Sequence, residues 1–478
     1  MIAPPAHPLP QRARPPRIAA LSGYMLYYEP HMPENFRAER AAWGKGIAEI
    51  LGSEGEARFF GLLLDEETGR QIGQELGDWQ PSAVVLAPAM PGPPAFSWAA
   101  LADLPRVPVV IWTANHLDSL PQTYNSVDHL ANSGNVGVAM IGNVLARDGR
   151  RTEVITGRWY DADSQDAARA AVRAACAAGR IARARVGVLG QPLDGYSNVT
   201  VDRAALAEGI GAQLVPIALA DWEQAFADAD AGDAGRVAAT LVERFNVTDV
   251  RGEDVRASCR LKVALEAVAT RFGPDCGTFN SHIEFSHANP KIGLVGGLAN
   301  SWLTSIGVPF TDTGDTITAI AMLAGRLLGG TAVYTELNTI DYAAGAILCA
   351  NTGEVDFSAA SAVSVFLARS FTGKNQRGAI VDAELRTGPA TIIGFTPHPD
   401  ARNGFRLIVL PGEVTGRPTL DLHVPHSLFR PRRGSAPAAF SAWIEAAATH
   451  HACLTLGDIT AAAVTAGRLM GIDVEVIA

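Results

Sequence analysis

Two apolar runs, Ala83-Val-Val-Leu-Ala-Pro88 and Pro108-Val-Val-Ile-Trp-Thr113, decide the fold of the first part of this chain. Each run has the length of a strand, and segments with helical spacing precede them at residues 34–51 and 66–76. Apolar strands that alternate with helices are typical of parallel sheets covered on both faces. We therefore predict an α/β fold, with an N-terminal doubly wound (Rossmann-like) domain over residues 17–160.

The same alternation repeats further along the chain. An Ala-rich helix is expected at residues 164–181, a strand at 185–189, and two longer helices at 234–245 and 253–272. Residues 161–329 are therefore predicted to form a second doubly wound domain.

After about residue 330 the pattern changes to short strands separated by Gly, Pro, Asp and Asn, with helices returning only at residues 438–447 and 458–470. Residues 330–478 are predicted to form a β-rich sandwich or barrel domain. The expected strands are residues 333–338, 346–350, 379–385, 391–395, 405–410 and 419–423.

Composition excludes several classes of protein. The 478 residues carry 39 Lys and Arg against 49 Asp and Glu, a net charge of −10, so no basic surplus exists to bind nucleic acid. No run of about 18 apolar residues is uninterrupted, and we expect no membrane span. The five cysteines are scattered, which argues against a disulfide scaffold or a zinc ribbon. Residues 1–16 are Pro-rich and lack an apolar core, so we expect a disordered arm, no secretory signal and a cytoplasmic protein.

Two glutamates and a histidine pair in the C-terminal part form a candidate metal site. Glu336 lies within an otherwise apolar strand, Glu354 follows the next strand, and a His450-His451 pair comes late in the chain. If the two strands form a hairpin, both carboxylates can point into one cleft. Two carboxylates and an imidazole suit Mn²⁺, Mg²⁺ or Co²⁺ better than thiolate-held zinc. The alternative is that these acids are only solvated strand ends.

A rival cluster is His282-Ile-Glu284-Phe-Ser-His287. On a strand, His282 and Glu284 would face the same side, and His287 could turn back after the bend. The alternative is a polar loop at the rim of a cleft, ended by Asn289-Pro290.

Aromatic and polar residues also follow two strands of the first domain. Trp112 and His116 come at the end of one buried strand, and Tyr24 comes just after the first. Ligands bind at the carboxyl ends of strands in open α/β sheets, so these residues are candidates for contact with a sugar. Plain packing is the alternative.

The order of motifs after residue 297 resembles the L-fucose/L-arabinose isomerase family. The segment Leu298-Ala-Asn-Ser-Trp-Leu-Thr-Ser-Ile-Gly-Val-Pro309 is followed by Gly314-Asp315, Glu336, Glu354, the late His450-His451 pair and Gly457-Asp458. The resemblance covers most of residues 17–478 in order.

The resemblance implies a metal-dependent aldose–ketose isomerase that acts on an L-fucose- or L-arabinose-like monosaccharide through an enediol. Glu336 and Glu354 would be metal ligands and acid/base groups, and His451 the third ligand. The metal would be Mn²⁺, with Mg²⁺ or Co²⁺ possible. Asp315 would support the site or contact substrate, and Asn351 would line the sugar cleft. A homotrimer or homohexamer, with active sites at subunit interfaces, is also implied.

The chain departs from the arabinose isomerase pattern at one further ligand. Residues 365–371, before Gly373-Lys374, contain no histidine, so the site resembles the three-ligand fucose isomerase version. Two other functions remain open. One is a non-catalytic sugar-binding or regulatory protein, which would not need the acid pair and His451. The other is an enzyme that applies the same chemistry to a different polyol.

Overall fold

The computed structural model describes residues 15–104, 107–247, 250–369, 377–422 and 424–477. Most of the predicted N-terminal arm, residues 1–14, lies outside these ranges. The described chain forms two compact units. The N-terminal unit comprises residues 15–182 and 464–471, and the C-terminal unit comprises residues 183–463 and 472–477.

The N-terminal unit is built on a parallel sheet with strand order β2-β1-β3-β4-β5. The two apolar runs at residues 83–88 and 108–113 contain its inner strands β3 and β4. The strands are β1 (Arg17–Gly23), β2 (Glu56–Leu63), β3 (Ala83–Leu86), β4 (Val109–Trp112) and β5 (Thr152–Ile155). The helices are α1 (Phe36–Leu51), α2 (Glu66–Trp79), α3 (Pro94–Leu101), α4 (Ser126–Ala131), α5 (Gly134–Arg147) and α6 (Ala162–Ile181).

Successive residues of the inner strands enter opposite cores, as the period-2 geometry of a strand requires. Ile18 and Ala20 pack with α1 and α6, whereas Ala19 and Leu21 pack with α2, α3 and α5. The sheet is therefore covered on both faces, which confirms the doubly wound prediction for this part. The Ala-rich helix α6, which was predicted to belong to the second domain, packs on this first sheet.

The C-terminal unit begins with a second parallel sheet of order β10-β9-β6-β7. The strands are β6 (Arg185–Leu189), β7 (Gln213–Pro216), β9 (Cys276–Phe279) and β10 (Phe310–Thr311). Helices α8, α10 and α11 share a core with these strands, and α12 contacts the same sheet as well as the strands that follow. The helices are α7 (Arg203–Gly209), α8 (Leu219–Asp228), α9 (Ala231–Arg244), α10 (Gly252–Phe272), α11 (Gly297–Ser305) and α12 (Thr316–Gly329).

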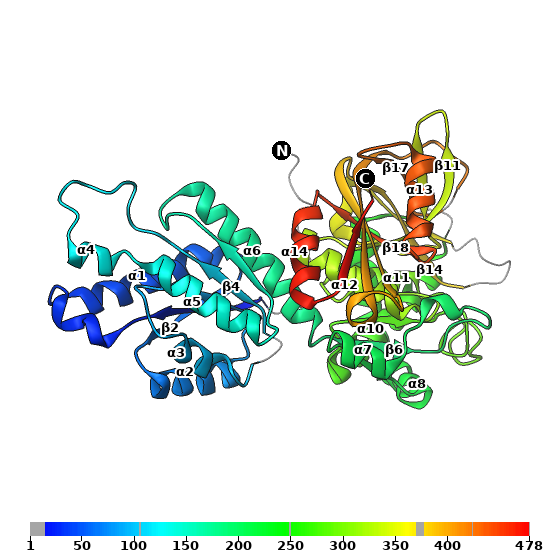
Figure 1. The fold of residues 1–478 in the computed structure, drawn as a ribbon. Helices are drawn as coiled ribbons and strands as arrows, with labels where there is room; N and C mark the ends of the chain where they lie inside the picture. The colour runs from blue at the N-terminus through cyan, green and yellow to red at the C-terminus, as the bar shows by residue number, and fades with distance from the viewer. Residues whose placement is uncertain (1–14, 105–106, 248–249, 370–376, 423, 478) are drawn as a thin grey trace. The chain divides into compact units, whose positions relative to one another are not determined.

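The last part of the chain, drawn in yellow to red in Figure 1, contains six antiparallel strands that close into a ring. The strands pair in the order β15-β18-β11-β12-β17-β16, and β16 pairs back onto β15. The sheet is thus a barrel, which confirms the β-rich C-terminal prediction. Its strands are β11 (Val333–Asp341), β12 (Ala346–Ala350), β15 (Gly388–Pro397), β16 (Phe405–Gly416), β17 (His426–Pro431) and β18 (His451–Leu456), and β19 (Asp473–Val476) adds in parallel to β16.

Smaller elements complete the C-terminal unit. A three-stranded sheet joins β8 (Asn246–Val247), β13 (Ala360–Arg369) and β14 (Ala379–Leu385), and α13 (Ala436–Glu445) is the last helix that lies wholly in this unit. Most of α14 (Thr460–Met470) belongs to the N-terminal unit, which includes residues 464–471. Among the described residues, no helix combines the length and apolar character needed to cross a bilayer.

One expected strand is wrong. Residues 419–422 form no strand, and the ring instead uses β17 at His426–Pro431. Pro418 and Pro425 bracket the expected strand and lack the N–H that a sheet ladder needs.

Candidate metal centre

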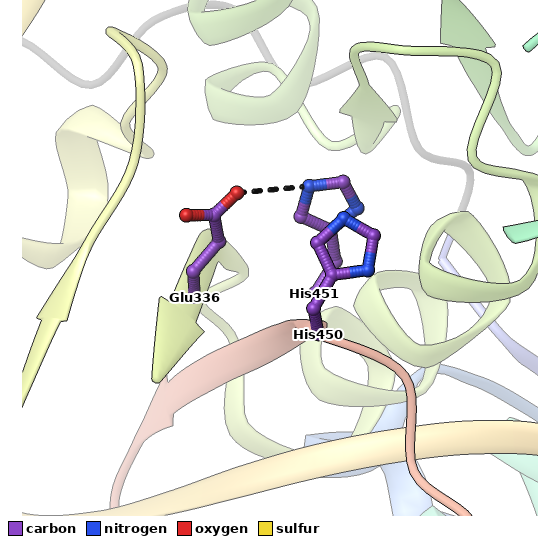
Figure 2. A group of neighbouring side chains, drawn as sticks. All are labelled: Glu336, His450 and His451. Atoms are coloured by element: carbon purple, nitrogen blue, oxygen red, sulfur yellow. Dashed lines mark ion pairs between the residues drawn. The ribbon is translucent and has the colours of Figure 1, made fainter. Parts of the chain in front are cut away.

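Glu336 and His451 face each other across two barrel strands. Glu336 of β11 is the antiparallel partner of His451 of β18, and Glu336 Oε1 lies 3.2 Å from His451 Nε2 (Figure 2). His451 is buried, whereas Glu336 is half-buried. The sheet register alone therefore brings together a carboxylate and an imidazole that are 115 positions apart in sequence.

Asp315 holds the other side of the same imidazole. Its Oδ2 lies 2.7 Å from His451 Nδ1, and its Oδ1 accepts a hydrogen bond of 2.8 Å from Thr318 N. Asp315 is thus the N-cap of α12 and is fully buried. Burial alone would lower the pKa of His451, but the hydrogen bonds and charges of Asp315 and Glu336 outweigh it and raise this pKa to about 9.

The contact with His451 also favours the ionised form of Glu336. Burial opposes its ionisation, yet the hydrogen bond and charge of His451, with a 2.9 Å hydrogen bond from Asn338 Nδ2, lower its pKa.

His450 lies next to this pair and is more exposed. The ligand atoms of Glu336, His450 and His451 all lie within 4.8 Å of one another, and Figure 2 shows the two rings side by side opposite the carboxylate. The His450 and His451 ring centroids are 3.9 Å apart. Of the residues that the structure describes, these three form the group able to converge on one metal ion.

Glu354, the second predicted ligand, is buried beside a different carboxyl group. Burial and then the charge and hydrogen bond of Asp312 raise the pKa of Glu354 well above its ordinary value. Asp312 follows β10 and accepts hydrogen bonds of 2.7 Å from the backbone and hydroxyl of Ser281. Glu354 is therefore placed to be the protonated member of a carboxyl pair.

Tyr334 lies between His451 and Thr313, the residue that follows Asp312. Its hydroxyl lies 2.8 Å from His451 Nδ1 and 3.4 Å from Thr313 Oγ1. Burial, followed by the charge of Asp315, raises the pKa of Tyr334 well above its ordinary value.

The remaining predicted residues of the C-terminal unit lie as follows. Asn351 is buried between β12 and Glu354, and its Oδ1 accepts a 3.0 Å hydrogen bond from Thr352 Oγ1. His282 and Glu284 lie in successive turns after β9, which agrees with the loop alternative and not with a strand. His282 Nε2 nevertheless lies 3.5 Å from Asp312 Oδ2.

The predicted residues of the N-terminal unit are described within that unit. Trp112 and Tyr24 are fully buried, and the Trp112 indole N–H donates a 3.0 Å hydrogen bond to Ser164 Oγ. Their role in sugar contact stays a prediction. His116 is only half-buried and contacts the Arg40 guanidinium.

The sequence pattern did not single out Tyr334 or Asp312. It did single out the His450-His451 pair, of which only His451 was expected to be a ligand. The signal for Tyr334 was present, since Tyr334 and Glu336 are two positions apart on one strand and share a face. No comparable signal marked Asp312, because a loop after a different strand brings it to Glu354.

The donor set fits a divalent metal ion. Glu336 offers a carboxylate oxygen, and His451 would offer Nε2 once a metal ion displaces the proton from that nitrogen. Asp315 orients the ring through Nδ1. This arrangement, in which a carboxylate orients a ligating histidine, is common at protein metal centres.

The fold and centre define a barrel domain with a glutamate–histidine site, built onto a parallel α/β sheet. Residues 331–473 match the family described as the L-arabinose isomerase C-terminal domain. The match covers the barrel, so this part of the chain is similar to the C-terminal domain of a sugar isomerase. No curated protein matches the chain.

Proposed function

We propose that the protein is a metal-dependent aldose–ketose isomerase of a free monosaccharide, as its barrel domain suggests. The observation that carries the proposal is the buried contact chain Asp315–His451–Glu336, with distances of 2.7 and 3.2 Å. Glu336 and His451 would hold the metal, with His450 or Glu354 as the further ligand. A non-catalytic sugar-binding protein would have no need of this arrangement.

The reaction requires two acid/base groups of opposite protonation. Isomerisation removes the proton from C2 of the aldose and returns one to C1, while O2 loses a proton and O1 gains one. A bound divalent ion would supply stabilisation of the negative charge that develops on the two sugar oxygens.

The two glutamates are suited to these roles. Glu336 has a lowered pKa and can accept a proton, whereas Glu354 has a raised pKa and can donate one. Environments that hold the pKa values of two carboxyl groups apart are what such acid/base pairs require. Buried Tyr334 and Asp312 would keep these protonation states in place.

The test is metal content together with ketose formation. Purified protein should contain about one Mn²⁺-class ion per chain, and it should form ketose from a pentose or 6-deoxyhexose in a chelator-sensitive manner. Glu336→Gln and His451→Ala should each lose both properties. Glu413→Gln, at an exposed position of β16, is the matched control and should keep them.

The same experiment separates the alternatives. Full turnover in Glu336→Gln or His451→Ala would exclude the assignment. A folded, metal-free protein that binds a sugar without turnover would favour the non-catalytic function. Metal content of Glu354→Gln and His450→Ala would identify the further ligand, because only a ligand's loss should lower affinity strongly.

The family resemblance also leads us to infer a homotrimer or homohexamer. Light scattering of the purified protein tests this, and a monomer would contradict it.

A further inference from the structure

Arg40, on α1 in the N-terminal unit, is a partly buried cation without a carboxylate partner. No carboxylate among the described residues lies within ion-pairing distance of its guanidinium, although the neighbouring Glu39 acts on it through space. Burial lowers the pKa of Arg40. A buried charge is costly unless it is paired, so this position calls for an anion.

Hydrogen bonding leaves most of the Arg40 donors free. Its Nη2 donates to Ala131 O at 3.1 Å, and its Nη1 contacts His116 Nε2. Its Nε is buried without a partner among the described residues. Since a guanidinium has five N–H groups, three of them remain to be satisfied.

His116 adds a further donor in the same place. Because Arg40 can only donate, His116 Nε2 must accept, and the proton of the neutral ring then lies on Nδ1. No hydrogen-bond partner for Nδ1 exists among the described residues, and the His116 side chain is half-exposed.

Aromatic rings enclose these donors. The ring centroids of Trp43 and Trp159 lie 5.1 and 6.5 Å from that of His116, and the Arg40 guanidinium lies 4.6 Å from the Phe36 centroid. Trp43 is 8% exposed, and its indole N–H has no partner among the described residues. The cluster thus offers several donors and one positive charge, and no carboxylate of the described residues pairs with that charge.

We propose that the N-terminal unit binds an anionic group, a carboxylate or a phosphate, at Arg40 and His116. The location agrees with general expectation, since His116 follows β4 and Arg40 follows β1 on α1, at the carboxyl edge of the parallel sheet. A planar guanidinium with free N–H groups matches both anions. The site depends neither on the metal centre nor on the proposed isomerase activity.

The test is calorimetric binding of inorganic phosphate, D-gluconate and neutral D-glucose to the full-length protein. Phosphate or gluconate should bind and glucose should not bind at this site. Arg40→Gln should weaken anion binding by at least about tenfold, because charge-assisted hydrogen bonds are lost. The anion that binds shows which kind of group the site takes, a phosphate group or the carboxylate of a sugar acid.

Two controls locate the binding. Arg37→Gln, exposed on the same helix and paired with Glu29, should leave anion affinity unchanged. Glu336→Gln should also leave it unchanged, whereas an anion held at the metal centre would be lost in that variant. Equal weakening by Arg37→Gln and Arg40→Gln would indicate a diffuse charge effect and overturn the proposal, as would binding of neither anion.

A measurement on the unmodified protein protects the test against misfolding of Arg40→Gln. The ring NMR signals of His116 should shift on addition of the bound anion. Unshifted His116 signals under saturating anion would overturn the proposal.

Discussion

His451 lies between two carboxylates, with Asp315 2.7 Å from its Nδ1 and Glu336 3.2 Å from its Nε2. The two carboxylates come from different structural sources. Glu336 arrives through the register of the barrel, and Asp315 through the cap of a helix that begins after a parallel strand. The imidazole of His451 is therefore held by a residue of the barrel and by a residue of the parallel α/β part of the C-terminal unit.

Asp315→Asn should lower the affinity for Mn²⁺ by about 10–100-fold, because the carboxylate no longer orients His451 or raises its basicity. The fold should persist, since asparagine is as good an N-cap as aspartate. Isothermal titration with Mn²⁺ measures this. Asp202→Asn, the N-cap of α7, is the matched control. Equal affinity in Asp315→Asn and the unmodified protein would contradict the orienting role.

Gly314→Ala should destabilise the C-terminal unit more than Gly330→Ala. Both glycines have a φ of 79°, which costs a non-glycine residue about 1–3 kcal/mol. A Cβ at Gly314 would also lie 2.6 Å from Pro192 N, whereas one at Gly330 would meet nothing within 4 Å. Urea unfolding of the two variants compares them. Equal losses would show that the turn before Asp315 relaxes freely.

Asp356→Ala should cost about 3–5 kcal/mol of unfolding free energy, since it leaves the Arg326 guanidinium buried and unpaired. Asp356 is fully buried and lies 2.7 Å from Arg326 Nη2. The exposed pair Arg430–Glu413 is the control, and Glu413→Ala should cost less than about 1 kcal/mol. Chemical denaturation monitored by fluorescence provides the values. A loss as small as the control's would mean that Arg326 finds another partner.

His116 should titrate with a pKa of about 4, because burial and then the charge of Arg40 disfavour its protonated form. The unfolded chain takes up this proton near pH 6.5. Between these values the unfolded state binds more protons, so the stability from His116 is complete above pH 6.5 and is lost as the pH falls toward 4. NMR titration measures the pKa, and Arg40→Gln should raise it. A value near 6.5 in the unmodified protein would refute the prediction.

Much of the fold could be predicted from local pattern. The apolar runs that begin at Ala83 and Val109 are enough to predict a parallel sheet, because strands covered on both faces are apolar throughout. The short strands after residue 330 likewise indicated a β-rich domain. Of the strand expected at residues 419–423, residue 423 lies outside the described residues, and residues 419–422 form no strand because a local pattern does not show whether a segment finds a strand partner.

Local sequence pattern was enough to predict the classes of domain and to single out Glu336 and His451. How these two residues are used depends on contacts between distant parts of the chain. The register of β11 against β18 places His451 opposite Glu336. Ser281, Asp312 and Asp315 come instead from the loops that follow β9 and β10 of the parallel sheet. Such contacts depend on the closure of a ring and on the packing of α12, which join residues far apart in the chain. The protonation states of the two glutamates also depend on the tertiary structure. Burial and neighbouring charge, rather than residue type, separate the pKa of Glu354 from that of Glu336.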